Sequence, residues 1–204
     1  MCSDHYVGKR SLSSDFDDLL SFTEPGNNGK IIVPWYDGER TPDLPYAAPV
    51  YFGFGLKDLN KRSIARSIIE GHILNLNAGF DKMPIQPKTI HLTGGLSRSR
   101  SWCQMIADIF QCQTVPVVGE GAALGAAIHA AWVWEKESGS QRSLKDIAST
   151  FVKFDENLRC IPQEKNKEAY NGLRSLYRSV NRRIRGLKSE DPFLMQKNLF
   201  QIKK

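Results

Sequence analysis

The sequence lacks long apolar runs and paired cysteines. Its longest apolar stretch is far shorter than the roughly 18 residues that a membrane-spanning helix needs, and its polar first residues do not form a secretory signal. The four cysteines show no C-x-x-C spacing: Cys2, Cys103, Cys112 and Cys160. We therefore expect reduced thiols in a cytoplasmic protein with no membrane partner.

Sequence signatures of several catalytic classes are also absent. The four histidines have no ligand spacing to one another or to a cysteine, so we predict no metal site. Neither the G-x-S-x-G turn of serine hydrolases nor the G-x-x-x-x-G-K-[ST] loop of P-loop nucleotidases occurs.

An excess of positive charge is confined to one end of the chain. The formal net charge is +6, but residues 161–204 carry 11 Lys and Arg against 4 Asp and Glu, a balance of +7. The other 160 residues therefore sum to −1. A basic tail of this kind is typical of a solvated helix face, and we do not expect nucleic-acid binding.

The remaining composition is that of a globular protein, with 41% hydrophobic and 25% charged residues in 204 residues. This length fits one domain or one lobe of a larger enzyme. The central pattern reads helix, strand, Gly-Gly, helix, strand and helix, which favours an α/β fold. We assign these elements to residues 60–80, 89–93, about 99–110, 114–118 and 122–134.

The chain divides into three predicted segments. Residues 1–29 are polar and include a short helix, and residues 30–160 form the α/β lobe. Residues 161–204 form a basic tail, in which apolar residues at helical spacing predict a helix over 164–186. Within the lobe, residues 31–33 read as a buried strand, and Gly71 in a helix marks close packing of another backbone.

Gly94 and Gly95 directly follow a predicted strand and precede a helix. Two glycines there let a flat group approach the backbone, and the helix that follows offers free N–H groups. A nucleotide across such a turn is one interpretation. A tight strand-to-helix turn with no ligand is the other, since G-x-G-x-x-G is not satisfied.

The helix over 122–134 carries small residues that predict close packing. Gly125 and the alanines around it form a face that another backbone could approach. A buried helix crossing is one interpretation, and the floor of a pocket beside the Gly-Gly turn is another. The loop 34–42 also has two interpretations. Asp37, Glu39 and Arg40 belong either to a surface turn or to a loop held by an Arg–carboxylate pair.

These features, in this order, resemble the FGGY family of carbohydrate kinases, and within it most closely the xylulokinases. The similar segments cover about residues 30–134, and they are P-W-Y-D-G-E-R-T-P (34–42), F-G-F-G-L (52–56), I-A-R-S-I-I-E-G (64–71), T-G-G-L-S-R-S (93–99) with Trp102, Ala107 and Asp108, and A-L-G-A-A (123–127). Leu96 and Ser67 are mild departures from the family pattern.

The resemblance implies a partial lobe of the actin-like, ribonuclease-H-like ATPase fold with a C-terminal helical extension. In that lobe Gly94 and Gly95 hold the adenosine of ATP, Ser99 contacts the adenine, and Gly121, Ala122 and Gly125 support the pocket. Glu70, Glu39 and Arg40 then stabilise the lobe. Mg²⁺ is bound through the ATP phosphates and through parts of the enzyme outside this sequence.

The resemblance also implies what this chain does not supply. The family's catalytic aspartate, its first lobe and most sugar contacts precede the matched region, so we assign no catalytic residue here. We therefore expect the C-terminal part of an ATP-dependent kinase for a ketose, D-xylulose first, as a possible homodimer and inactive in isolation. The alternative is a non-catalytic nucleotide-binding or interaction fragment.

Overall fold

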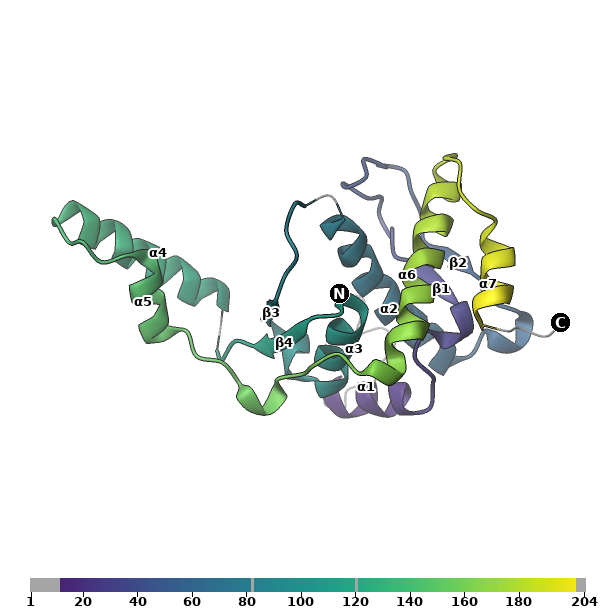
Figure 1. Cartoon of the computed structure of the whole chain (residues 1–204), viewed down its shortest axis with the longest axis horizontal. Helices are drawn as coiled ribbons and strands as arrows, with labels where there is room; N and C mark the ends of the chain where they lie inside the picture. Colours follow the sequence, from purple (N-terminus) through teal and green to yellow (C-terminus); the bar gives the residue numbers. More distant parts are fainter. Residues whose placement is uncertain (1–11, 82, 120, 201–204) are drawn as a thin grey trace. The chain divides into compact units, whose positions relative to one another are not determined.

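The computed structural model describes residues 12–81, 83–119 and 121–200 (Figure 1). They form two compact units, the first from the described residues of Met1–Pro87, Asp108–Gln111 and Pro162–Lys204, and the second from Lys88–Ala107 and Cys112–Ile161. The first unit contains α1 (Leu12–Ser21), β1 (Ile31–Val33), β2 (Val50–Phe52), α2 (Lys61–Phe80), α6 (Glu164–Ile184) and α7 (Pro192–Phe200). The second contains β3 (Thr89–Leu92), most of α3 (Arg100–Phe110), β4 (Gln113–Pro116), α4 (Gly121–Glu137) and α5 (Leu144–Phe151).

The core of the first unit is built on β1. Its three residues are fully buried, as predicted, and β1 pairs with β2 in antiparallel register. Helix α2 packs on β1 at Gly71, where an added methyl carbon would lie 3.1 Å from the Ile32 carbonyl carbon and closer to its oxygen. The predicted close approach at Gly71 is therefore confirmed, and the neighbouring backbone is that of β1.

Helix α6 packs against α2 through the predicted apolar stripe. Tyr170, Leu173, Tyr177 and Val180 are buried, whereas Ile184, the last residue of the predicted stripe, is 41% exposed. The Tyr177 hydroxyl donates to Asn75 Oδ1 at 3.0 Å, and the Tyr170 hydroxyl donates to Glu70 at 3.1 Å. The stripe therefore joins two helices that lie about 100 residues apart in the sequence.

Helix α7 was not predicted, because the residues after 186 show no apolar periodicity. It lies beside α6 (Figure 1). The buried Gln196 side chain donates from Nε2 to the carbonyl oxygens of Asn28, Gly29 and Gly53, at 3.2–3.3 Å. One amide thus ties the end of the chain to two turns of the first unit.

The second unit has a parallel β3–β4 pair, with Thr89 opposite Gln113 and Leu92 opposite Pro116. On the other edge, Thr114 of β4 forms an isolated antiparallel bridge to Cys160, and Val117, just after β4, forms another to Phe154. Cys103, Ala107 and Cys160 form a buried cluster against which Leu92 packs. The described cysteines are free thiols, and burial raises the pKa of Cys103 to about 11.

Candidate functional site

The carboxyl ends of β3 and β4 lie side by side in the second unit. The Val117 N–H, just after β4, donates to the Leu92 carbonyl at the end of β3, at 2.8 Å. Each strand then leads through a turn into a helical segment, a 3-10 helix (Gly95–Arg98) that precedes α3 in one case and α4 in the other. This edge is where ligands bind in open α/β sheets.

Gly94 and Gly95 form the turn after β3. Gly94 has φ 93°, a backbone conformation that favours glycine, and its carbonyl accepts the Ser97 N–H at 3.2 Å and the Ser97 hydroxyl at 2.7 Å. Both glycines are exposed, and no described atom lies within 4 Å of a Cβ added to either one. Hydrogen bonds from Ser97 therefore hold the turn, and no described atom covers the side of the turn on which a glycine Cβ would lie.

Ser99 directly precedes α3 and is only 3% exposed. Its hydroxyl accepts the Trp102 N–H at 3.2 Å, and its carbonyl accepts the Cys103 N–H at 3.0 Å. Ser99 is thus the N-cap of α3. Contact between Ser99 and adenine stays a prediction, and a ligand would meet the backbone of Gly94 and Gly95 before this buried hydroxyl.

Gly121 brings the start of α4 against the end of β3. An added Cβ at Gly121 would lie 2.5 Å from Thr93 Oγ1 and 3.1 Å from Thr93 Cβ, so a larger residue does not fit there. Thr93 is a neighbour of the site that sequence reasoning did not single out. The sequence feature that could have identified Thr93 is its position, directly after a strand and before two glycines.

The rest of α4 does not pack as predicted. Ala122 and Gly125 are exposed, and no described atom lies within 4 Å of a Cβ added at Gly125. Among the described side chains of α4, Ile128 alone is buried, and α5 lies beside the helix (Figure 1). The prediction of a closely packed small-residue helix is therefore wrong for the described chain, because no described segment covers that side of α4.

Apolar side chains flank the Gly-Gly turn. Leu96 is 44% exposed and Val118 is 52% exposed at the ends of the two strands. Between residues 88 and 119 the sequence has one acidic residue, Asp108. Its carboxylate accepts the Gln163 N–H at 2.7 Å and the Asn166 amide at 2.8 Å, so Asp108 has a structural role.

Residues of the first unit that resemble family motifs also have structural roles. The Glu70 carboxylate is 1% exposed, and its Oε1 accepts the Gly26 N–H at 2.9 Å, Arg66 Nη1 at 2.9 Å and the Tyr170 hydroxyl at 3.1 Å. Burial raises the pKa of Glu70. The same Arg66 donates to the Leu20 and Thr23 carbonyls, so this network joins three parts of the unit.

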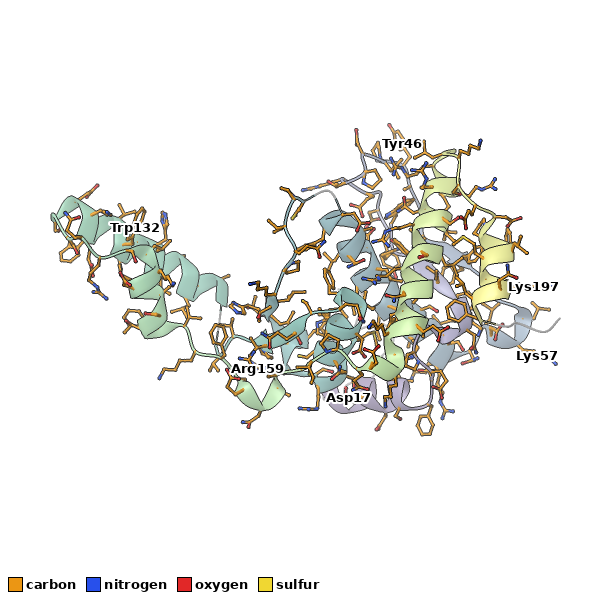
Figure 2. The ribbon with its side chains drawn as sticks, viewed as in Figure 1. Asp17, Tyr46, Lys57, Trp132, Arg159 and Lys197 are labelled. Atoms are coloured by element: carbon orange, nitrogen blue, oxygen red, sulfur yellow. The ribbon has the colours of Figure 1, made fainter. Side chains whose placement is uncertain are left out.

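The loop 34–42 is ordered by Glu39. Its Oε1 accepts the Arg40 N–H at 2.8 Å and the Thr41 N–H at 3.3 Å, and its Oε2 accepts the Asn75 amide at 2.8 Å. The ion pairs of the described residues do not include Glu39 with the exposed Arg40 side chain. The loop is therefore held by backbone amides and by α2. Tyr46, farther along the loop, is 98% exposed (Figure 2).

The described residues include neither a metal-ligand cluster nor a membrane-spanning helix. Within residues 12–81, 83–119 and 121–200, no three His, Cys, Asp or Glu side chains are grouped so that they could hold a metal ion. In the same part of the chain, no helix has both the length and the apolar character needed to cross a membrane.

Known proteins share both the sequence pattern and the fold. The pattern described as the FGGY family of carbohydrate kinases, C-terminal domain, matches residues 9–134. The Haemophilus influenzae xylulose kinase is 29% identical over 173 residues, which cover 81% of this chain and 34% of that protein. The Bacillus licheniformis gluconokinase is 31% identical over 187 residues, which cover 87% of this chain and 35% of that protein.

A solved structure of ligand-bound xylulose kinase from Lactobacillus acidophilus matches with a TM-score of 0.76 and 26% identity, covering 90% of this chain and 37% of that one. This match confirms the predicted partial α/β lobe of the actin-like ATPase fold. The chain spans about a third of the length of the curated relatives it matches. Pattern, relatives and fold agree: the chain belongs to the FGGY family of carbohydrate kinases, and it matches the C-terminal domain of that family.

Proposed function

We propose that this chain is the adenosine-binding, C-terminal part of an ATP-dependent kinase that phosphorylates a ketose, with D-xylulose as the first substrate to test and xylulose 5-phosphate as its product. One observation carries the proposal. In a chain of this family, the exposed Gly94–Gly95 turn lies at the carboxyl edge of two parallel strands, with the start of α4 beside it.

This edge suits the adenosine end of ATP better than the reacting end. The bare backbone of Gly94 and Gly95 accepts a flat ring, and the exposed Leu96 and Val118 offer apolar contact at its sides. The N-terminal end of α4 attracts negative charge. Gly121, Ala122 and Gly125 would support this pocket from α4.

The chemistry of transfer would come from outside this sequence. Phosphoryl transfer needs a group that accepts the sugar hydroxyl's proton and positive charge on the phosphates. FGGY kinases use ATP and a divalent metal, but the described residues do not include a set of ligands for one. We therefore assign Mg²⁺ and the catalytic base to the remaining part of the enzyme, and we expect this chain alone to be inactive.

The names of the relatives refer to more than one sugar substrate. Relatives at about 30% identity include both xylulose kinases and gluconokinases. We place D-xylulose first because it is the substrate named for several of the relatives and solved structures. We further propose a cytoplasmic enzyme that meets its sugar through the missing lobe, with no nucleic-acid or membrane partner and with homodimers possible.

The adenosine site is tested by Gly95→Val. An added side chain meets no described atom within 4 Å, so the fold should be unchanged by circular dichroism. It would fill the space above the turn, and ADP binding measured by calorimetry should weaken at least tenfold. The matched control is Gly95→Ala, which adds one methyl group and should weaken binding less. Unchanged ADP affinity in Gly95→Val would show that adenosine does not lie on this turn.

A second function would use the same Gly94–Gly95 turn without the phosphoryl-transfer step. The chain could bind nucleotide without taking part in catalysis. The two functions are separated by supplying the N-terminal part of a family kinase and following ADP production with D-xylulose. Sugar-dependent turnover supports the kinase, whereas nucleotide binding with no turnover for any tested sugar supports the binding fragment.

A further inference from the structure

A dense run of positive charge covers the C-terminal half of α6 and the turn after it. Residues 174–188 contain six Lys and Arg and no Asp or Glu. Among the ion pairs of the described residues, one involves this run, between Arg178 and Asp81. Most of the positive charge of the run is therefore not neutralised by the described chain.

Three arginines of this run follow one face of α6. Arg174, Arg178 and Arg182 recur at every fourth residue, so successive side chains start about 6 Å apart along the helix axis. They lie outside the apolar stripe, in which Tyr170 and Tyr177 are buried. These three side chains, the arginine row, therefore form a line of cations on the part of α6 that the stripe leaves free.

Two members of the arginine row are each held by a pair of hydrogen bonds. Arg178 donates from Nε and Nη2 to the two carboxylate oxygens of Asp81, at 2.6 and 2.7 Å. Arg182 donates from Nε and Nη2 to the Lys188 carbonyl, at 3.0 and 2.8 Å. In both side chains the remaining nitrogen, Nη1, makes no hydrogen bond to a described residue. It is therefore available to a partner.

Arg174 carries the least compensated charge of the arginine row. It is half-buried, its Nη2 donates to Asn171 Oδ1, and its buried Nε has no hydrogen-bond partner among the described residues. Burial and the neighbouring Arg178 lower the pKa of the Arg174 guanidinium, and the opposite effect of Asp81 is smaller. A cation that is partly dehydrated and lies beside another cation is stabilised by an added anion.

Fixed donors distinguish the arginine row from an ordinary solvated helix face. A free surface arginine loses side-chain freedom when it binds a partner, and this loss weakens the binding. Arg178 and Arg182 are already held by two hydrogen bonds each, so they have less freedom to lose. Arg174 is half-buried before any partner binds. The row is therefore preorganised to bind negative charge.

We propose that the arginine row is a docking surface for an acidic peptide segment of a partner protein. Carboxylates are good acceptors for the N–H donors of guanidinium groups. A partner helix with an acidic residue at every fourth position repeats at the same spacing of about 6 Å. An extended partner with acidic residues at alternate positions repeats at about 6.5 Å. Either one places successive carboxylates beside successive arginines.

Other anions fit the arginine row less well. A single phosphate ion is much shorter than the row, which extends about 12 Å from Arg174 to Arg182. Single-stranded nucleic acid is bound through aromatic side chains on which bases stack, and both tyrosines of α6 are buried. Duplex binding uses many phosphate contacts over a wide basic surface, whereas residues 1–160 sum to −1.

The test uses the whole chain and one probe, a fluorescently labelled peptide made of glutamate alone and long enough to span the arginine row. Fluorescence anisotropy measures its affinity in about 50 mM and about 200 mM salt. We expect binding at the lower concentration and at least tenfold weaker binding at the higher one, because salt screens exposed charges. With the peptide bound, amide exchange should slow at residues 174–188 and stay unchanged in α5.

Paired substitutions test the arginine row itself. Arg174→Gln combined with Arg182→Gln should weaken binding of the glutamate peptide at least tenfold, and circular dichroism checks that the variant folds. The matched control is Arg40→Gln combined with Arg98→Gln, which removes the same charge at exposed positions outside α6 and should change the affinity less than threefold. Replacing Arg174 and Arg182 by lysine keeps the charge but not the fixed donors, so the affinity should fall between the other two.

Three results would overturn the proposal. One is no binding of the glutamate peptide at the lower salt concentration, and another is an equal loss of affinity in the two pairs of glutamine variants, which would make binding a property of net charge. The third is tighter binding of a single-stranded oligonucleotide of equal charge, which would make the row a nucleic-acid surface. The inference is independent of the proposed function, since failure to bind ADP would refute that function and leave the arginine row unaffected.

Discussion

Two glycines of α2 should respond to the same substitution with opposite signs. Replacing a helical glycine by alanine stabilises a helix by roughly 1 kcal/mol, because alanine loses less backbone freedom on folding. At Gly79 no described atom lies within 4 Å of the added methyl group, so that gain should be realised. At Gly71 the methyl group would meet the backbone of Ile32, with 3.1 Å to the carbonyl carbon and less to its oxygen.

The collision at Gly71 should outweigh the gain in helix propensity. Ile32 is fully buried in β1 and paired with Tyr51 of β2, so its carbonyl cannot move without shifting the strand. Overpacking in a core costs about 1–3 kcal/mol, and here the obstacle is backbone and not a flexible side chain. We expect Gly71→Ala to destabilise the first unit by about 2 kcal/mol, a difference of about 3 kcal/mol from Gly79→Ala.

Amide exchange in α2 measures both effects, because it reports the unit that contains the helix. A loss of about 2 kcal/mol corresponds to roughly thirtyfold faster exchange, and a gain of about 1 kcal/mol to roughly fivefold slower exchange. Circular dichroism of the native proteins checks that both variants fold. If Gly71→Ala slowed exchange as Gly79→Ala does, α2 would not lie against β1 as described.

Four further substitutions test other parts of the fold. Ser99→Ala should cost about 1 kcal/mol in urea unfolding through the lost cap of α3, and unchanged stability would contradict the capping role. Glu70→Gln should lower the free energy of unfolding of the first unit by about 3 kcal/mol, because buried donors lose a charged partner. Amide exchange at residues 20–26 should become faster. Gln196→Ala should speed amide exchange in α7 but not in α2, because the lost hydrogen bonds hold α7 alone. Equally faster exchange in both helices would contradict this local role of Gln196. Hydrogen bonding from Ser143 holds the pKa of Asp146 low, so protection of α5 should fall in acid below the ordinary aspartate range. In Asp146→Asn, protection of α5 should be less dependent on pH.

Elements fixed by local pattern could be predicted from the sequence. The strand at residues 31–33, the helix from Asn60 and the stripe of α6 follow from side-chain periodicity and capping, and the structure has all three. The close approach at Gly71 could be predicted because glycine inside a helix is costly unless the missing side chain is needed. Its partner, β1, could not be named, since nothing local links Gly71 to Ile32.

Elements held by distant contacts could not be predicted. Helix α7 lacks a regular apolar stripe, and it is held by Gln196 through carbonyls that lie 143–168 residues earlier in the chain. No local pattern indicates that residues from the N-terminal and C-terminal segments share the first unit. For the candidate site, the glycine turn was predicted, but the role of Thr93 beside Gly121 depends on two loops that meet only in the folded unit.

The failed prediction for α4 is informative about the molecule. The small residues from Gly121 to Ala131 predict a close neighbour on physical grounds, because this stretch has no Asp, Glu, Lys or Arg and one polar side chain, His129, and so gains little from contact with water. The described chain supplies such a neighbour on one side alone, through α5. The prediction of close packing therefore holds for the side of α4 that faces α5, and it fails for the side that carries Ala123, Ala126 and Ala130.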